Sequence, residues 1–456
     1  RDPGVAVFEL VKNAYDADAS VVTISMLGLG EALDAWTRLE QLIIGLEESR
    51  KAGVQVTIDA ANITKSATSI KDAIGELQSG RISLKATART QALDLLQEAL
   101  REIATIASAR IIVTDDGTGM DWETVSNVWL EPGTDFRGQQ RAATNPSARR
   151  SSRYRRLPLG EKGVGRFAAH KLGNRVQMVT KARGHSEVIV DLNWDAFTNE
   201  RYLSDATVLV SERAPKCFTD NLCGTRIEVS DLRAVWTRGM VRDLKRAVTS
   251  ICSPFSGPDA FECTLALDPE PRWLSGLLYV GDVLPLALFR ALCVLDGTLL
   301  KYQYEFRPYP SMDRVAGRKV PPHDWREMHL SDRDGKPLDL SRHKIGTVKI
   351  DLHIFDREPQ VLSLGVSDRR GLKEYLDCNG GVRVYRDNIR VFDYGEPGND
   401  WLQFDVRRVN IPTKRISNNL VIGAVSLALE QSSDLVEKTN REGFVETDAT
   451  RAFRDA

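Results

Sequence analysis

The sequence predicts a two-domain protein of the α+β class, and three observations support this prediction. The chain has 456 residues, which is longer than one typical domain. Amphipathic helical patterns and short β-branched runs follow one another along most of its length. A helical pattern over roughly 235–252 ends at Ser253 and Pro254. We therefore place the boundary there, with one domain at 1–253 and a second at 254–456.

The composition is that of a globular protein and argues against several other classes. Hydrophobic residues make up 42% of the chain and charged residues 27%. The net charge of −1 gives no overall attraction to nucleic acids or membranes. The 6 cysteines form no C-x-x-C pair, so neither zinc nor a redox dithiol is expected. No apolar run reaches membrane-spanning length and no signal peptide is visible, which predicts a cytoplasmic protein.

The first part of the chain is expected to form a helix, a strand, a helical insertion and a second strand. The helical pattern covers 5–17, and the β-branched run Val21–Met26 follows it. Two apolar stripes at helical spacing lie within 27–109, which we interpret as an insertion with its own core. A short strand at 54–58 is possible between them. Arg110–Thr114 then predicts a strand that leads directly into an Asp-Gly turn.

The rest of the chain is predicted in less detail. Residues 131–160 are polar, rich in arginine and interrupted by Pro and Gly, which predicts a long functional loop. The further elements expected in the first domain are a helix at 167–172 and strands at 176–180, 187–192 and 225–229. Those expected in the second domain are strands at 346–355, 381–385 and 389–392 and a helix at 371–376. The run 419–429 fits a helix or a strand.

Glu9 and Asn13 are the first candidate site residues. They lie four residues apart on the first helix, so their side chains project from one face. An Asn amide oxygen can bind Mg²⁺, which also takes substrate phosphates. A carboxylate one turn away can polarise a water for attack on a γ-phosphate. Asp16 lies on nearly the same face, and a plain solvent-facing polar stripe would show the same pattern.

A second motif, Asp115-x-Gly117-x-Gly119, follows the second expected strand and is itself followed by Met120. An ionised Asp only accepts hydrogen bonds, so Asp115 suits the exocyclic amino group of adenine. The glycines allow the backbone to turn and to approach a ring closely. On its own the motif could equally be a simple Asp-Gly turn.

A third motif, Gly160-x-x-Gly163-x-Gly165, precedes an expected helix. Glycine-rich backbone at a helix N-terminus presents N–H groups to phosphate oxygens. Lys162 and Arg166 stand where cations would meet those oxygens. The motif fits neither a dinucleotide-binding βαβ unit nor a P-loop, because a polar loop precedes it rather than a strand.

The order of the three motifs resembles that of the GHKL ATPases, a superfamily that includes gyrase-type topoisomerases, Hsp90 chaperones, histidine kinases, MutL and MORC proteins. Its N, G1 and G2 boxes resemble Glu9–Ala17, Asp115–Met120 and Gly160–Gly165. Gly224 and Thr225 resemble its Gly-Thr motif near adenine. The resemblance covers roughly 1–240 and implies a Bergerat-type ATP-binding α/β sandwich. The insertion at 27–109 departs from the smaller members.

The resemblance also implies ATP and Mg²⁺ as cofactors and assigns roles to single residues. Glu9 would be the base that activates the attacking water, and Asn13 would be the Mg²⁺ ligand. Asp115 would bind adenine, with support from Thr225. The other residues expected around the nucleotide are Asp16, Gly117, Gly119, Met120, Lys162, Gly163 and Gly165.

The arginine-rich loop at 131–160 has three interpretations. The resemblance implies a lid that closes over the triphosphate of ATP. Between Asp135 and Glu161 the loop carries arginines and no acidic residue, which also suits the phosphates of a nucleic acid. The third interpretation is a disordered, solvated loop.

The second half of the chain resembles the transducer domain that follows the ATPase domain in this superfamily, a fold similar to ribosomal protein S5 domain 2. Gly380–Val391 resembles a strand pair of MORC-like proteins. Gly165–Ala168 and Asn440–Phe444 resemble segments of MORC/Hsp90-like bacterial ATP-binding proteins. In the family, a transducer cation reaches the γ-phosphate and stabilises charge that develops during transfer. Lys414 is the candidate here, and Arg408 and Arg415 are the alternatives.

The function expected from these features is Mg²⁺-dependent binding and slow hydrolysis of ATP. ATP would close the lid and favour a homodimer, which would act on a nucleic acid or a protein partner and not on a membrane. One alternative is a histidine-kinase-like phosphotransferase, which needs a phospho-accepting His on a dimerisation helix; His170 is on an expected helix, but its place in the phosphate-loop region favours a structural role. The other is an Hsp90-like chaperone that uses ATP as a switch.

Overall fold

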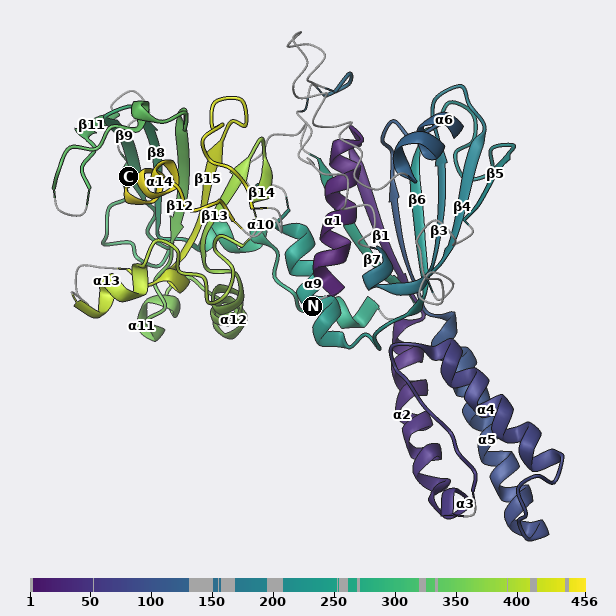
Figure 1. The fold of residues 1–456 in the computed structure, drawn as a ribbon. Helices are drawn as coiled ribbons and strands as arrows, with labels where there is room; N and C mark the ends of the chain where they lie inside the picture. The colour runs from purple at the N-terminus through teal and green to yellow at the C-terminus, as the bar shows by residue number, and fades with distance from the viewer. Residues whose placement is uncertain are drawn as a thin grey trace. The chain divides into compact units, whose positions relative to one another are not determined.

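The computed structural model divides the chain into two compact units, which are drawn in Figure 1. The first unit comprises residues 1–249 and 261–275, and the second comprises 250–260 and 276–456. The residues that the structure describes are 3–51, 53–130, 151–154, 156, 169–194, 208–251, 253, 261–268, 271–319, 325–332, 335–391, 393–410, 416–438 and 443–456.

A seven-stranded sheet with the order β5-β4-β3-β6-β2-β1-β7 forms the centre of the first unit. Its strands are β1 (Val21–Leu27), β2 (Arg110–Asp115), β3 (Gly173–Lys181), β4 (Glu187–Asn193), β5 (Leu209–Arg213), β6 (Gly224–Leu232) and β7 (Glu262–Asp268). Neighbouring strands are antiparallel except for β1 and β7, which are parallel. Because β7 completes this sheet, the first unit includes residues beyond 253.

Helix α1 (Pro3–Asp16) packs beside α9 (Arg238–Thr249), as Figure 1 shows. Apolar side chains of α1 are fully enclosed, among them Val7, Leu10 and Val11. The helix ends in a tight turn, in which Ala17 and Asp18 donate backbone hydrogen bonds to the carbonyls of Asn13 and Tyr15. The turn then delivers the chain into β1. Further along, α6 (Trp122–Thr124) is followed by a π-helical turn at Val125–Trp129.

Four helices lie between β1 and β2 and form an arm at one end of the sheet (Figure 1). They are α2 (Leu29–Gly45), α3 (Glu47–Lys51), α4 (Ile63–Gln78) and α5 (Ala86–Ser108). The arm has its own apolar core, which includes the buried side chains of Leu39, Ile70, Leu77, Leu96 and Ile103. These residues recur at helical spacing, so one stripe of each long helix faces the others.

The base of the arm is joined to the end of β6 by a buried carboxylate. Asp231 accepts hydrogen bonds from the Thr64 hydroxyl at 2.9 Å and from the Asn174 side chain at 3.2 Å. Thr64 belongs to the first turn of α4, and Asn174 belongs to β3. The same amide group of Asn174 also donates to the carbonyl of Ala61. The arm is therefore hydrogen-bonded to two strands of the sheet where it emerges.

The segment 54–58, considered above as a possible strand, is not a strand. Val54 and Val56 do alternate into the core of the arm, which explains the strand-like pattern. The backbone N–H of Thr57, however, donates to the Ser69 hydroxyl at 2.9 Å, and that of Asp59 to the Ser66 hydroxyl at 2.8 Å. Side chains of α4 thus take the place of a partner strand.

An eight-stranded sheet forms the second unit, with the order β10-β9-β8-β12-β15-β13-β14 and with β11 paired to β9. Its strands are β8 (Phe289–Asp296), β9 (Leu299–Phe306), β10 (Arg318–Lys319), β11 (Arg326–His329), β12 (Val348–Ile354), β13 (Gly381–Arg386), β14 (Ile389–Val391) and β15 (Val421–Leu427). The run 419–429, which fitted either type of element, therefore contains a strand. This is a mixed α+β architecture in both units.

Two apolar clusters stabilise the second unit. One includes Val382, Val384 and Val425 of the sheet, with Phe444 and Phe453 packed against them. The other joins Ile422 to helix α12. The helices of this unit are α10 (Val280–Val283), α11 (Pro359–Leu362), α12 (Arg369–Asn379), α13 (Phe404–Asn410) and α14 (Asp448–Asp455). Because Val425 and Ile422 point to opposite sides of β15, the clusters lie on opposite faces of the sheet.

Three arginines of the β13–β14 hairpin are buried, namely Arg383, Arg386 and Arg390. Arg390 forms an ion pair with Glu396 at 2.6 Å and donates to the Ser250 hydroxyl at 2.6 Å. Burial, together with the nearby charge of Arg383, lowers the pKa of Arg390 to about 10. A guanidinium in such surroundings needs its acidic partner, because an isolated buried charge is very costly.

We predict that Ser66→Ala destabilises the arm, whereas Ser69→Ala has little effect. Ser66 is fully buried, so removing its hydroxyl leaves the N–H of Asp59 without an acceptor. The expected loss in free energy of unfolding is about 1–3 kcal/mol for Ser66→Ala. It is below about 0.5 kcal/mol for Ser69→Ala, whose hydrogen bond is exposed. Native-state hydrogen exchange of arm amides measures both, and equal losses would contradict the prediction.

Candidate functional site

Helix α1 shows an interrupted pattern of burial between Ala6 and Asp16. Every residue in this stretch is buried except three, which are only partly covered: Glu9, Asn13 and Asp16. These three recur at the spacing i, i+4 and i+7, so they share one side of the helix. A helix on a protein surface would expose a broad polar face. Here the polar groups instead form a narrow stripe on a helix that is otherwise enclosed.

The loop after β2 lies against the C-terminal end of α1. The backbone N–H of Thr118 donates to the carbonyl of Ala17 at 2.8 Å. Gly117 lies so close to the same turn that a Cβ at this position would be 2.6 Å from the Ala17 carbonyl oxygen. The Glu9–Ala17 motif and the Asp115–Met120 motif lie about 100 residues apart in the sequence. This contact brings them together in space. Asn13 and Asp16 precede this contact on α1, and Asp115 precedes it on β2.

Asp115 occupies the last position of β2 and is held by two backbone donors. Its Oδ1 accepts hydrogen bonds from the N–H of Gly117 at 2.9 Å and from that of Thr225 at 3.2 Å. The register of the sheet places Asp115 directly opposite Thr225 on β6. One carboxylate oxygen is thus fixed by the protein, and the other makes no described hydrogen bond.

Burial raises the pKa of Asp115 to about 7, and the two backbone hydrogen bonds only partly oppose this effect. The charge of the neighbouring Asp116 acts in the same direction as burial. Asp115 therefore changes its protonation state near neutral pH. Carboxyl groups with strongly shifted pKa values are frequent at functional sites. Burying such a group costs stability, and binding a ligand is one role that accounts for it.

Thr180 is a member of this site that the sequence patterns did not reveal. It lies on β3 opposite Thr225, and the two hydroxyl oxygens are 3.0 Å apart. The Thr180 hydroxyl oxygen also accepts the N–H of Met120 at 3.0 Å. Only the strand register identifies Thr180 as part of the site, because the register aligns Asp115, Thr225 and Thr180 across three adjacent strands.

Two glycines allow the backbone segments of the site to come together. Gly119 has a φ of 63°, and a Cβ there would lie 1.9 Å from the carbonyl oxygen of Lys181. Gly224 has a φ of 148°, and a Cβ there would lie 2.1 Å from the carbonyl oxygen of Asp115. No other residue fits such distances without moving the backbone.

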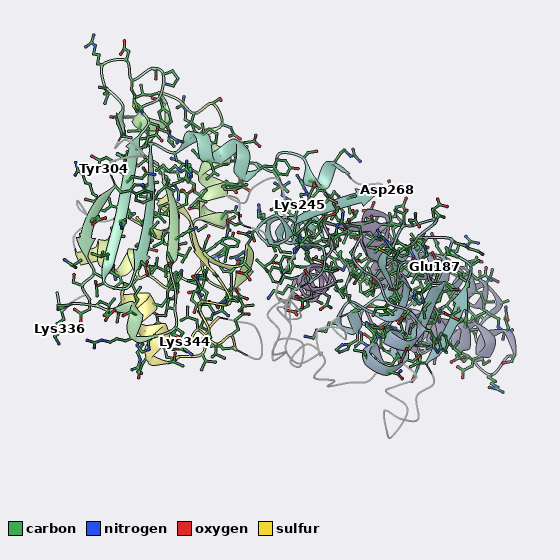
Figure 2. All side chains as sticks on the ribbon, turned by 90° about the horizontal axis from the view of Figure 1, so that it is seen from above. Glu187, Lys245, Asp268, Tyr304, Lys336 and Lys344 are labelled. Atoms are coloured by element: carbon green, nitrogen blue, oxygen red, sulfur yellow. The ribbon has the colours of Figure 1, made fainter. Side chains whose placement is uncertain are left out.

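The loop before β6 is held by Glu187, which is labelled in Figure 2. Its fully buried carboxylate accepts hydrogen bonds from the Arg213 side chain at 2.8 Å and from the backbone N–H of Phe218 at 2.7 Å. Burial works to raise the pKa of Glu187, but the hydrogen bonds outweigh it and lower the pKa below its ordinary value. Phe218 in turn contacts Gly224, so Glu187 supports the start of β6.

Several expected site residues lie outside the described part of the chain. These are Lys162, Gly163 and Gly165 of the third motif and Lys414 of the second domain. Arg408, an alternative to Lys414, lies on α13. Among the described residues, no group of three or more His, Cys, Asp or Glu side chains could hold a metal ion. A single Asn ligand remains compatible with Mg²⁺, which keeps several waters and binds mainly to phosphates.

Residues 83–225 match a protein-family model described as "Histidine kinase-, DNA gyrase B-, and HSP90-like ATPase". The match supports the GHKL superfamily and, with it, ATP binding and ATP hydrolysis in general. It includes Asp115, the Gly160–Gly165 motif and Thr225, but it begins after α1. Glu9 and Asn13 lie outside the matched residues. No curated protein matches the chain.

Among the described residues, no helix is long and apolar enough to cross a membrane.

We predict that Gly119→Ala destabilises the first unit far more than Gly184→Ala. Both glycines have a positive φ, but a Cβ on Gly184 would meet no atom within 4 Å. The strained φ alone costs about 1–2 kcal/mol, which is the expected effect at Gly184. At Gly119 the clash with Lys181 adds about 1–3 kcal/mol.

Urea unfolding followed by tryptophan fluorescence compares the two variants with the parent protein. Losses of the same size at both positions would show that the close approach of Gly119 to Lys181 does not constrain the loop.

Proposed function

We propose that this protein is a Mg²⁺-dependent ATPase whose triphosphate lies along the stripe on α1. The observation that carries this proposal is that, between Ala6 and Asp16 of α1, partial exposure is restricted to Glu9, Asn13 and Asp16. A helix that only covers a protein surface exposes a broad face, and it does not bury all side chains except an acid and an amide one turn apart and a second acid. A narrow polar stripe on an otherwise buried helix is expected where the helix forms one wall of a binding site.

The adenine end of the nucleotide would lie at Asp115. Its free oxygen accepts the exocyclic amino group, while Gly117 and Thr225 hold the other oxygen. Gly119 and Met120 supply close backbone, and Thr180 fixes Met120 by the hydrogen bond described above. The match of residues 83–225 to a family of ATPases supports adenine nucleotide as the ligand.

Hydrolysis would take place beside the first half of α1. Asn13 would hold Mg²⁺, which would neutralise charge on the bound triphosphate. Glu9 accepts a proton from a water that attacks the γ-phosphorus in line, and the products are ADP and phosphate. Lys162 and Lys414 are the proposed cations for the phosphate oxygens. Asp16 binds nearby and steadies the loops at the end of the helix.

We further propose that ATP favours a closed homodimer that acts on a nucleic acid or a protein partner. The support for this step is the resemblance of the chain to transducer-containing GHKL proteins and the excess of arginine in 131–160. The family description names histidine kinases, DNA gyrase B and HSP90 together. It therefore does not select one kind of partner, and an experiment has to identify it.

We predict that Glu9→Ala abolishes hydrolysis but leaves ATP binding nearly intact. Loss of a general base lowers kcat by about 10²–10⁴-fold. The affinity for ATP should change by less than about threefold, since Glu9 acts on the water and not on the nucleotide. Phosphate release gives kcat, and calorimetry with a non-hydrolysed ATP analogue gives the dissociation constant.

Glu98→Ala, which changes an exposed acid on the arm, is the control and should behave like the parent protein. Turnover at the parent rate in Glu9→Ala would remove Glu9 from the role of base. Stable transfer of the labelled γ-phosphate to the protein would contradict hydrolysis and would favour a kinase.

We predict that adenine nucleotides bind about tenfold more tightly at pH 8 than at pH 6. The amino group of adenine donates to the ionised form of Asp115, and its pKa of about 7 leaves that form in the minority at pH 6. Binding should therefore release a proton near neutral pH. Titration calorimetry of Mg-ADP in two buffers of different ionisation enthalpy measures this release.

Asp115→Asn is the matched control, because its side chain keeps an acceptor oxygen and does not titrate. Affinity for this variant should be lower and should vary little between pH 6 and pH 8. An equally steep pH dependence in Asp115→Asn would assign the titration to another group.

A further inference from the structure

Asp18 combines burial with an unfavourable backbone conformation. It lies in the turn between α1 and β1, where its side chain is only 2% exposed. Its φ is 63°, in the left-handed region that glycine enters freely and that most other residues avoid. If this turn required only a change in chain direction, glycine would be the better residue. Compared with glycine, aspartate accepts some backbone strain at this position, and its carboxylate is the group that distinguishes the two residues.

That carboxylate receives hydrogen bonds from a distant segment of the chain. Oδ1 accepts from the Ser151 hydroxyl at 2.7 Å, and Oδ2 accepts from the backbone N–H of Arg153 at 2.7 Å. The N–H of Tyr154 is 3.2 Å from Oδ1 and 3.3 Å from Oδ2. Ionised acceptors form stronger hydrogen bonds than neutral ones, so three donors on one carboxylate give a firm attachment.

Arg156 attaches the same segment to the same turn at a second point. Its guanidinium lies 4.4 Å from the ring centre of Tyr15 and 4.6 Å from that of Tyr154. It also donates a hydrogen bond to the carbonyl of Ala19. Phe261, which precedes β7, is a third ring within 5.5 Å of this cation. Cation–π contacts of this kind hold a guanidinium flat against aromatic side chains.

The neighbouring Asp116 completes the attachment from the side of β2. It accepts hydrogen bonds from the N–H groups of Ser20 at 2.7 Å and of Val21 at 2.8 Å. Its other oxygen lies 3.7 Å from the guanidinium of Arg153. The α1–β1 turn, the end of β2 and residues 151–154 and 156 are thus linked by two carboxylates and two arginines.

The position of this attachment in the sequence gives it a role at the nucleotide. Asp18 follows Asn13 by five residues, and Arg156 precedes Gly160 of the third motif by four. The attachment therefore joins the helix of the proposed base and Mg²⁺ ligand to the segment that leads into the proposed phosphate loop.

We propose that Asp18 is a positioning residue of the nucleotide site. Its carboxylate fixes residues 151–154, which precede the glycine-rich motif in the sequence, against the end of the helix that carries Glu9 and Asn13. This inference rests on the proposed function and adds to it a residue that neither touches the nucleotide nor takes part in the proton transfer.

The test replaces Asp18 with glycine and compares it with Asp220→Gly. Asp220 is exposed and has a φ of 52°, so both substitutions relieve the same kind of backbone strain. The φ at position 18 suits glycine, so the variant is expected to fold. Hydrogen exchange at the amides of Arg153 and Tyr154, measured without nucleotide, should accelerate at least about tenfold in Asp18→Gly. It should stay unchanged in Asp220→Gly.

The second measurement is the steady-state hydrolysis of ATP. We expect the KM for ATP to rise about tenfold in Asp18→Gly while kcat changes by less than about threefold, because the base and the Mg²⁺ ligand remain in place. Asp18→Asn should restore KM to within about threefold, since Asn tolerates the left-handed region and its amide oxygen accepts one N–H.

The outcomes separate this inference from the function on which it rests. A parent protein that turns over ATP, with an unchanged KM in Asp18→Gly, would overturn the positioning role alone. Unchanged amide exchange at Arg153 and Tyr154 would overturn the attachment itself. A parent protein that does not bind ATP would overturn the proposed function and this role together.

Discussion

The arrangement of the candidate site depends on the contact between the end of α1 and the loop after β2. Thr118 donates to Ala17, and Gly117 is small enough to let the two backbones touch. This one contact joins the end of the helix that carries Glu9 and Asn13 to the loop that follows Asp115, whose pKa is near neutrality. The sheet register, the glycines of the loop and the attachment of residues 151–154 and 156 all preserve it.

Helices and strands whose own residue types and spacing favour them were predictable from the sequence. The β-branched run at Val21–Met26 and the continuous apolar run before Asp115 form strands, and α1 has the periodicity of a helix. The segment 54–58 shows the limit of this reasoning. Its alternation reports burial of Val54 and Val56 correctly, but the acceptors of its N–H groups are serines on a helix. Periodicity cannot distinguish a strand from an extended chain that runs along a helix.

The members of the site that depend on long-range pairing were not predictable in the same way. Thr180 matters because β3 and β6 pair in one register, and a shift by one residue would turn its hydroxyl to the other face. Asp18 matters because its φ is positive, and a single aspartate in a sequence does not reveal the sign of φ. The motif at Gly160–Gly165 and Lys414 remain expectations of the sequence, since both lie outside the described residues.

The arm has a mechanical consequence for the proposed adenine end of the site. Helix α5 contains 23 residues, and Ala109 alone separates it from β2, which ends at Asp115. At 1.5 Å per residue the helix is a lever about 35 Å long, so a rotation of about 5° at its base moves its tip by about 3 Å. At the base of the arm, Asp231 of β6 accepts hydrogen bonds from Thr64 of α4 and from Asn174 of β3. A displacement of the arm therefore acts on β3 and β6, the two strands that carry Thr180 and Thr225.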